Sequence, residues 1–469
     1  MKPPGPAAKR FSAGMDSGGC EKPRVDLQYG AMNDVKDRLN RLRRERKARD
    51  RTRSIQESWS EIDRQDGLTT REKLEQLINL RRTGTGTPKT KTAPPVTPVP
   101  DRERIRFTEN AYSPDARYGR IRIADGLEIP GEILACLSRD PEFEQLDLSS
   151  ALFVDLETTG LSGGTGTVPF NIGLGYYRDG RFVVGQYFLG ELAAEEEMIA
   201  DFGRFIEEGG FRSVVTYNGK AFDIPMLETR FILHRTPLRL SGLPHLDFLF
   251  PARNLWKHKH ESCRLFHLAR EVLQTGRDED IPSAEIPWRY VEYLRTGDFE
   301  LIEPILYHNA EDILSLLGMV IMGASLLQDG EPGERDAMDM FGAAKVLERG
   351  GETRKAADLY QAALDGALSE EVGLSARRRL ASRFKRRQDW ERAVELWRQM
   401  AESPDESRDV MYSLRELSMY YEHRRGDFAA AFKYAEEGYV VSLGFSESYQ
   451  DDFTRRRERL KKKMRRSGG

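Results

Sequence analysis

Residues 152–160 read LFVDLETTG, and this stretch decides the fold class. Three apolar residues followed by Asp155 and Glu157 predict a buried strand that ends in two carboxylates. Side chains alternate faces along a strand, so these two acids project to the same side, about 7 Å apart. Carboxylates that share a face of a core strand repel each other, and a divalent cation is the usual compensation. A bare Asp-x-Glu more often marks a strand that frays into a polar loop, so further partners are required.

The chain has 469 residues, enough for two or three domains, and a net charge of -3 that indicates no particular partner. Cys20, Cys136 and Cys263 are odd in number and widely spaced, which predicts a reducing compartment rather than a disulfide framework. The N-terminus lacks the apolar segment of a signal peptide. The longest uncharged run, 313–328, is shorter than the ~20 residues of a membrane span. We therefore expect a soluble cytoplasmic protein that does not enter a membrane.

Residues 1–100 predict a basic N-terminal region that is partly helical and partly disordered. Its Arg-rich block, 32–56, favours a helix that could bind a phosphate backbone or could simply be solvated. A second short helix is expected at 69–80, where TTRE resembles a capping box. The Thr- and Pro-rich stretch 83–100 predicts a linker, and so a domain boundary.

The segment after residue 150 predicts a mixed α/β sheet with flanking helices. Strands at 170–177 and 181–189, joined through Asp179-Gly180, form a predicted hairpin, so the first three strands are antiparallel. A helix at 194–208 and a strand at 213–217 follow. That strand delivers Asp223 at the head of a predicted helix, where ligand sites of such sheets collect.

The last helix of this segment, 303–327, supplies two more candidate site residues. His308 and Asp312 are four residues apart and therefore share one helical face. Four carboxylates and one histidine thus arrive from four elements. Two divalent ions ~4 Å apart could activate a water and stabilise a departing phosphate oxygen. An imidazole with a pKa of ~6.5 is suited to accept the proton of that water.

The motifs DLETTG, NGKAFD and HNAED resemble those of the DEDD exonucleases, the DnaQ-like branch of the ribonuclease H-like fold. More narrowly, several stretches over 107–328 are similar to the YprB family of bacterial ribonuclease H-like proteins: LFVDLETTGLSGGTGT, VVTYNGKAFDIPMLETR, HLDFLFPARNLWK, ESCRL, IPWRYVEYLRTGD and HNAEDILSL. The resemblance implies a ribonuclease H-like exonuclease domain at 101–330 that removes nucleotides from a single-stranded 3′ end with Mg²⁺ or Mn²⁺. It also implies the metal ligands and the general base: Asp155, Glu157, Asp223 and Asp312, with His308 as the base.

The spacing of the base departs from the usual pattern. Histidine-type members of the superfamily usually place four residues between His and the final Asp, whereas the tyrosine type has three. His308 has the tyrosine-type spacing, and Tyr307 lies one residue earlier. We predict His308, because it shares a face with Asp312 and titrates near neutrality, with Tyr307 as the alternative. Ser283 and Pro169 also depart from the family pattern, and neither is a predicted ligand.

A second group of side chains could suggest zinc, since four potential ligands lie within ten residues: His258, His260, Cys263 and His267. Their spacing matches no structural zinc site, and a helix would scatter them around its circumference. We expect Cys263 to be packed. The neighbouring basic residues predict a rim for the nucleic-acid backbone, formed by Arg253, Lys257, Lys259 and Arg264.

From residue 335 the sequence is helical and repeats. Tyr360, Trp397 and Tyr434 are spaced 37 residues apart, and small residues on the preceding segments keep the same interval. This pattern resembles tetratricopeptide repeats and predicts an all-α solenoid at 335–447. The solenoid could bind a protein partner or only stabilise the chain. The basic tail, 448–469, predicts a solvated or nucleic-acid-contacting extension.

The function that these residues favour is a two-metal 3′ to 5′ exonuclease acting on DNA or RNA. Two alternatives stay open. One is a catalytically silent nucleic-acid-binding or scaffold protein, which clustered carboxylates disfavour because they repel phosphate. The other is an endonuclease on the same fold, since the position of cleavage depends on the shape of the strand channel.

Overall fold

The computed structural model describes residues 103–160, 166–276, 281–328, 335–404, 406–445 and 447–467. These residues belong to one compact unit, Thr97–Gly469. The predictions for residues 1–100 lie outside the described residues.

A mixed sheet forms the centre of this unit. Within the described ranges it has six strands in the order β1-β6-β5-β4-β7-β8. Strand β5 is antiparallel to both β4 and β6, as predicted, β7 runs parallel to β4, and β8 runs parallel to β7. The strands of the sheet are β1 (Ile105–Tyr112), β4 (Ala151–Thr158), β5 (Pro169–Arg178), β6 (Arg181–Leu189), β7 (Ser213–Thr216) and β8 (His245–Asp247).

Helices flank the sheet on both faces, which agrees with the predicted fold class. A short pair, β2 (Arg117–Tyr118) and β3 (Ile121–Arg122), lies apart from the sheet. The helices before residue 330 are α3 (Gly131–Ser138), α4 (Glu195–Gly209), α5 (Asp223–Leu233), α6 (Leu249–Trp256), α7 (Leu265–Glu271), α8 (Glu285–Thr296) and α9 (Glu303–Ser325).

The predicted hairpin turn has the backbone geometry that its sequence favours. Asp179 and Gly180 have φ angles of 52° and 75°, so both central residues are left-handed. A two-residue turn of this kind matches the right-handed twist of the strands, and Asp-Gly tolerates it well. Strand β1, which the sequence did not predict, pairs with β6 at the edge of the sheet. Most of its side chains are exposed, so it lacks an apolar pattern.

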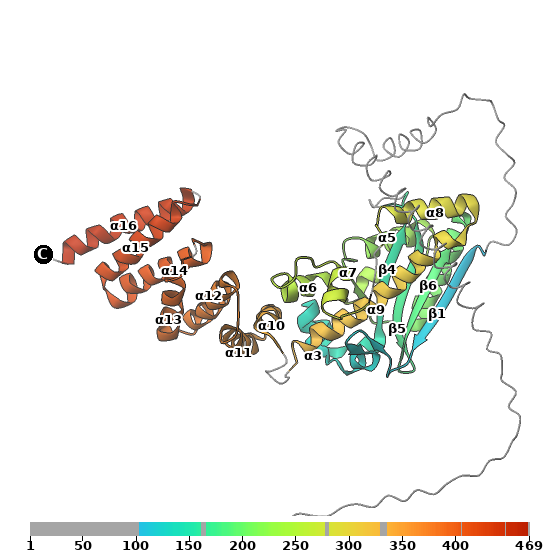
Figure 1. Cartoon of the computed structure of the whole chain (residues 1–469), viewed down its shortest axis with the longest axis horizontal. Coiled ribbons are helices and arrows are strands. Elements are labelled where there is room, and N and C mark those ends of the chain that lie inside the picture. The colour runs from blue at the N-terminus through green and yellow to red at the C-terminus, as the bar shows by residue number, and fades with distance from the viewer. Residues whose placement is uncertain are drawn as a thin grey trace, which may run out of the picture. The chain divides into compact units, whose positions relative to one another are not determined.

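The central strand β4 separates two apolar cores. Phe153 belongs to one core, and Leu152 and Val154 belong to the other, as the alternation of side chains along a strand requires. Helix α9 lies across the sheet in Figure 1 and contacts β4, β5 and β6. By length and composition alone, Phe299–Ser325 could cross a membrane, but 61% of its apolar window is buried inside the protein. Core packing therefore accounts for its apolar character.

The region after residue 335 is helical, as predicted, and each helix packs on the next one in the chain. Its helices are α10 (Ala337–Arg349), α11 (Thr353–Leu364), α12 (Glu370–Arg386), α13 (Trp390–Ala401), α14 (Arg408–Tyr420), α15 (Phe428–Ser442) and α16 (Glu447–Ser467). Two of the repeated aromatic side chains, Tyr360 and Trp397, are buried. That these helices form tetratricopeptide-like repeats stays a prediction.

The basic tail differs from the extension expected from its sequence. It forms helix α16, which packs against α15. Phe453 and Leu460 are buried, and a Cβ on Gly438 of α15 would meet the ring of Phe453. Arg459 forms two hydrogen bonds with the buried carboxylate of Glu422. Two apolar contacts and a buried ion pair therefore hold this segment, although its composition is mostly basic.

The helical region continues the core of the α/β region. Phe341 of α10 belongs to the same apolar cluster as Trp256 of α6 and Phe153 of β4. Gly342 lies so close to α6 that a Cβ there would meet the carbonyl oxygen of Leu255 at 2.2 Å. Only a glycine permits this approach of the two backbones.

Candidate functional site

The five residues predicted for the site line one pocket of about 410 Å³. The pocket lies where β4 ends and where the segment after β7 enters α5, at the edge to which parallel strands bring their carboxyl ends. Its predicted members are Asp155, Glu157, Asp223, His308 and Asp312. The other lining residues include Phe222, Met226, Thr229, Ile286 and Pro287.

Each element presents its acid for a local reason. Asp155 and Glu157 alternate with Leu156 on β4 and so share one face of the sheet. Asp223 is the first residue of α5, where the positive end of the helix dipole favours a carboxylate. His308 and Asp312 occupy one face of α9, with His308 Nδ1 3.1 Å from Asp312 Oδ2 and 4.0 Å from Glu157 Oε1. The side chains of four elements therefore converge.

The pocket concentrates negative charge in a buried place. Burial, with the charges of Asp312, Asp223 and Glu157, raises the pKa of Asp155 well above its usual range, and His308 opposes this rise. Burial and the charge of Asp247 raise the pKa of Asp223 to about 7. Like charges in a low-dielectric site disfavour ionisation of one another. A positive ligand would relieve this repulsion.

The sequence analysis missed Asn309, which fixes the position of Asp155. Its Nδ2 donates to Asp155 Oδ2 at 2.8 Å and to the Asp155 carbonyl at 3.2 Å. Its Oδ1 accepts from Gln186 Nε2 at 2.9 Å. The side chain is fully buried, and a Cβ on Gly173 would lie 2.1 Å from its Oδ1. The amide therefore links β4 to β6 under the pocket floor.

We expect Asn309→Ala to lower the free energy of unfolding by about 1–3 kcal/mol, because Gln186 and Asp155 each lose a buried partner. Urea unfolding at a fixed pH measures the change. Asn254→Ala is the control: its amide donates to the Phe250 carbonyl at the surface of α6, so its effect should stay within about 0.5 kcal/mol. Equal effects of the two substitutions would contradict this role of Asn309.

The sequence analysis also missed Asp247, which shapes the segment before Asp223. Its carboxylate, at the end of β8, accepts hydrogen bonds from the backbone N–H groups of Asn218, Lys220 and Leu249. The side chain is buried, and Asn218 adopts a left-handed φ of 71°. Carboxylates that accept several backbone bonds fix the course of a loop. Asp247 therefore sets the position from which α5 and Asp223 begin.

Tyr307 lies apart from the pocket lining. Its side chain is 68% exposed, and it is not one of the lining residues. His308, one residue later, has a side chain that is only 13% exposed and faces the acids. The turn of α9 therefore places the two candidate bases in different directions.

The donors suit a hard divalent cation, since Mg²⁺ and Mn²⁺ prefer carboxylate oxygens. The raised pKa values of Asp155 and Asp223 are the observation that supports this fit. Among the residues that the structure describes, no three His, Cys, Asp or Glu side chains are gathered closely enough to hold an ion. The pocket therefore contains the residue types that bind such a cation. Their side chains would have to move closer together to coordinate one ion.

The histidine-rich group near Cys263 has other contacts. His258 Nε2 lies 2.7 Å from the Met338 carbonyl, and its ring stacks edge-on against Phe341. One member of the predicted basic rim is wrong: Lys259 pairs with Asp336 at 2.5 Å and Asp339 at 2.7 Å. These two acids at the start of α10 neutralise the ammonium group. Lys259 therefore joins the segment after α6 to α10 and does not serve as a free phosphate contact.

Comparisons with known proteins agree with this architecture. The model of the RNase_H superfamily matches residues 152–322, a range that contains all five predicted site residues. Domains of this superfamily indicate nuclease-like hydrolases that act on nucleic acids. Over 317 residues the chain is 31% identical to the uncharacterized protein YprB of Bacillus subtilis (strain 168). The matched region covers 67% of this chain and 75% of that protein. The chain therefore belongs to the YprB family and carries a domain of the RNase H superfamily.

Proposed function

We propose that this protein is a metal-dependent nuclease that removes nucleotides from the 3′ end of DNA or RNA. The observation that carries the proposal is the convergence of four carboxylates and one imidazole on a single pocket of an RNase H superfamily domain. Such a pocket repels phosphate in the absence of cations. A protein that only binds nucleic acid gains nothing from it.

The four acids have the role of metal ligands in this proposal. Asp155, Glu157, Asp223 and Asp312 would hold two divalent ions, Mg²⁺ or Mn²⁺. Bound ions would supply a nucleophile at neutral pH and stabilise the charge on the departing oxygen. Asn309 keeps Asp155 oriented toward the pocket through the bond at 2.8 Å.

His308 is the proposed general base. Its Nδ1 lies 3.1 Å from Asp312 Oδ2, so the carboxylate would stabilise the imidazolium that forms when the ring accepts a proton.

An exposed aromatic side chain at the pocket supports a single-stranded end as the substrate. Phe222 lines the pocket, yet 55% of its surface is exposed. Aromatic faces stack on unpaired bases with little regard to sequence. A terminal base that stacks on Phe222 would place its phosphate toward the acids.

The test is cleavage of 5′-labelled single- and double-stranded DNA and RNA with Mg²⁺ or Mn²⁺. A ladder of products shortened from the 3′ end, absent when EDTA is added, is the expected result. Circular single strands separate the alternatives, because an endonuclease would cut them and an exonuclease would not. If no substrate is degraded with either metal, the silent binder, with α10–α16 as a partner surface, is the better account.

The two candidate bases predict different kinetics. His308→Ala is expected to lower the turnover rate by about 10²–10⁴-fold, the range for loss of a general base. Tyr307→Phe removes a hydroxyl from an exposed side chain outside the pocket lining and should change the rate less than about twofold. Single-turnover cleavage measures both. Loss of activity only in Tyr307→Phe would show that the assignment to His308 is wrong.

A further inference from the structure

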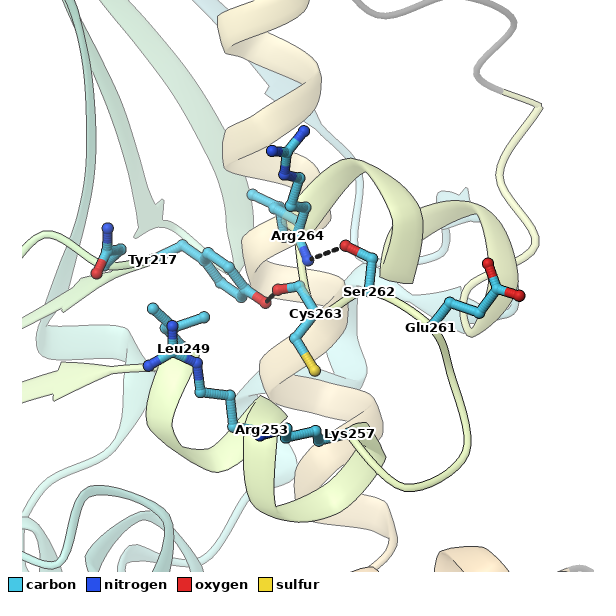
Figure 2. Close-up of a pocket in the computed structure, with 10 residues that line it drawn as sticks. Tyr217, Leu249, Arg253, Lys257, Glu261, Ser262, Cys263 and Arg264 are labelled. Atoms are coloured by element: carbon cyan, nitrogen blue, oxygen red, sulfur yellow. Dashed lines mark hydrogen bonds between the residues drawn. The ribbon is translucent and has the colours of Figure 1, made fainter. Parts of the chain in front are cut away.

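A second concave site is lined in part by the segment between β7 and α5, which also carries Asp223. It is a cleft of about 710 Å³, here called the cationic cleft. Figure 2 shows Arg253 on α6, Lys257 directly after that helix, and Cys263 and Arg264 on the segment before α7, with the Tyr217 ring among them. The cleft is lined by Tyr217, Asn218, Leu249, Arg253, Lys257, Glu261, Ser262, Cys263, Arg264 and Leu265.

The charge of the cleft is positive and largely uncompensated. Arg253, Lys257 and Arg264 are exposed, and none forms an ion pair with another described residue. Glu261 is the acid among the lining residues. Guanidinium groups in such a place match the geometry of phosphate oxygens.

The wall of the cleft is rigidly held. The Tyr217 hydroxyl donates a hydrogen bond to the Cys263 carbonyl, which ties the end of β7 to the segment before α7. The Arg264 N–H donates to Ser262 Oγ at 3.2 Å. On the opposite wall, α6 is anchored by buried Leu255 and Trp256. Arg253 therefore projects from a packed helix, and Lys257 and Arg264 lie directly after α6 and directly before α7.

Positive charge extends from the cleft onto α10. Burial, together with the charges of Arg379, Arg349 and Lys257, lowers the pKa of Lys345 to about 8. Burial is the first cause of this shift, and the three neighbouring cations add to it. A polyanion at this surface would favour the charged form of Lys345.

The cleft and the carboxylate pocket share one short segment. Asn218 lines the cleft, and Asp223, five residues later, lines the pocket. Five residues span at most about 17 Å when fully extended, and the hydrogen bond from Ala221 N–H to the Asn218 carbonyl shows that this segment is folded more tightly. A nucleic-acid strand advances about 3.4 Å per nucleotide in a stacked helix. Both sites therefore lie within reach of one strand a few nucleotides long.

We propose that the cationic cleft binds the sugar–phosphate backbone of the substrate strand, a few nucleotides from the end that enters the carboxylate pocket. This inference rests on the proposed nucleic-acid substrate. Arg253, Lys257 and Arg264 contact phosphates and position the strand without reading its sequence. The acids repel the strand at the pocket, so the cleft supplies much of the binding free energy.

The test measures binding separately from cleavage. The full chain carrying Asp155→Asn is titrated into 5′-fluorescein oligo(dT) or oligo(U) of about 15 nucleotides, and anisotropy is followed at several salt concentrations. The cleft variant combines Arg253→Gln, Lys257→Gln and Arg264→Gln. The matched control removes three exposed arginines that line neither site: Arg139→Gln, Arg181→Gln and Arg212→Gln.

The cleft variant is expected to bind at least about tenfold more weakly, with a salt slope smaller by about 2, because three phosphate contacts are lost. The control should bind as the parent does. Equal affinity of the cleft variant and the parent, no binding by the parent, or equal competition by polyglutamate would overturn the inference. Binding that depends on the cleft, without cleavage by the Asp155-containing chain, would support the cleft and reject the nuclease. Thermal melts establish that both triple variants are folded, and the three single substitutions provide an independent series.

Discussion

Replacing Asp155 by asparagine is expected to reduce cleavage at least ~1,000-fold, which corresponds to about 4 kcal/mol of transition-state stabilisation. The same change should raise the free energy of unfolding when no divalent ion is present. Asp155 is partly buried beside Asp312, Asp223 and Glu157, and each of these charges raises its pKa. Asparagine keeps the shape of the side chain and removes the charge. Loss of function and gain of stability are thus two consequences of one substitution.

Two measurements on the same preparation check this prediction: cleavage of labelled oligonucleotides with Mn²⁺ and urea unfolding in EDTA. Asp358→Asn is the matched control, since Asp358 is an exposed acid on α11. It should leave both quantities unchanged. A variant at Asp155 that lost stability in EDTA would show that its carboxylate is structurally favourable, and the account of a strained acidic pocket would then be wrong.

Without divalent ions, the pocket is expected to destabilise the protein as the pH rises from about 4 to about 7. The pKa of Asp223 is about 7 in the folded protein against 3.8 for an ordinary aspartate, so the folded state holds more protons between these values. Stability from a raised pKa is present below the unfolded value and is lost as the pH passes the folded one. A difference of three pH units corresponds to about 4 kcal/mol. The opposite case, Glu422 with a pKa of about 2, acts below this window.

Addition of Mg²⁺ or Mn²⁺ should therefore raise the melting temperature strongly at pH 8 and weakly at pH 5, where protons occupy the same carboxylates. Thermal melts across pH 5–8, with EDTA or with each metal, measure the effect. Asp223→Asn should flatten the pH dependence in EDTA and reduce the shift with metal. A shift that is equal at both pH values would mean that the metal binds elsewhere.

The sequence predicted the parts of this molecule whose patterns are local. The apolar run before Asp155, the Asp-Gly turn and the four-residue spacing of His308 and Asp312 each carry their own structural signal, and the structure places them as expected. Strand β1 has no such signal, because an edge strand exposes most of its side chains.

Local sequence patterns could not predict the roles of the residues that support the site. Asn309 lies between two predicted site residues, His308 and Asp312. Its role depends on a hydrogen bond to Asp155, which lies 154 positions away in the chain. Asp247 accepts hydrogen bonds from backbone N–H groups, and no pattern of side chains in the sequence predicts such bonds. The sequence predicted Lys259 as a phosphate contact, but in the structure it forms ion pairs with Asp336 and Asp339 at the start of α10. Each case depends on tertiary pairing, which single-sequence patterns do not encode.

The close approach of α6 and α10 at Leu255 and Gly342 has a consequence for how the protein unfolds. Trp256 and Phe341 belong to one apolar cluster, so a chain cut after residue 330 would uncover part of its own core. Such a fragment would expose apolar surface to solvent and tend to aggregate. The α/β region and the helical region are therefore expected to melt together in one cooperative transition, and a destabilising substitution in α10 should lower the melting temperature of both.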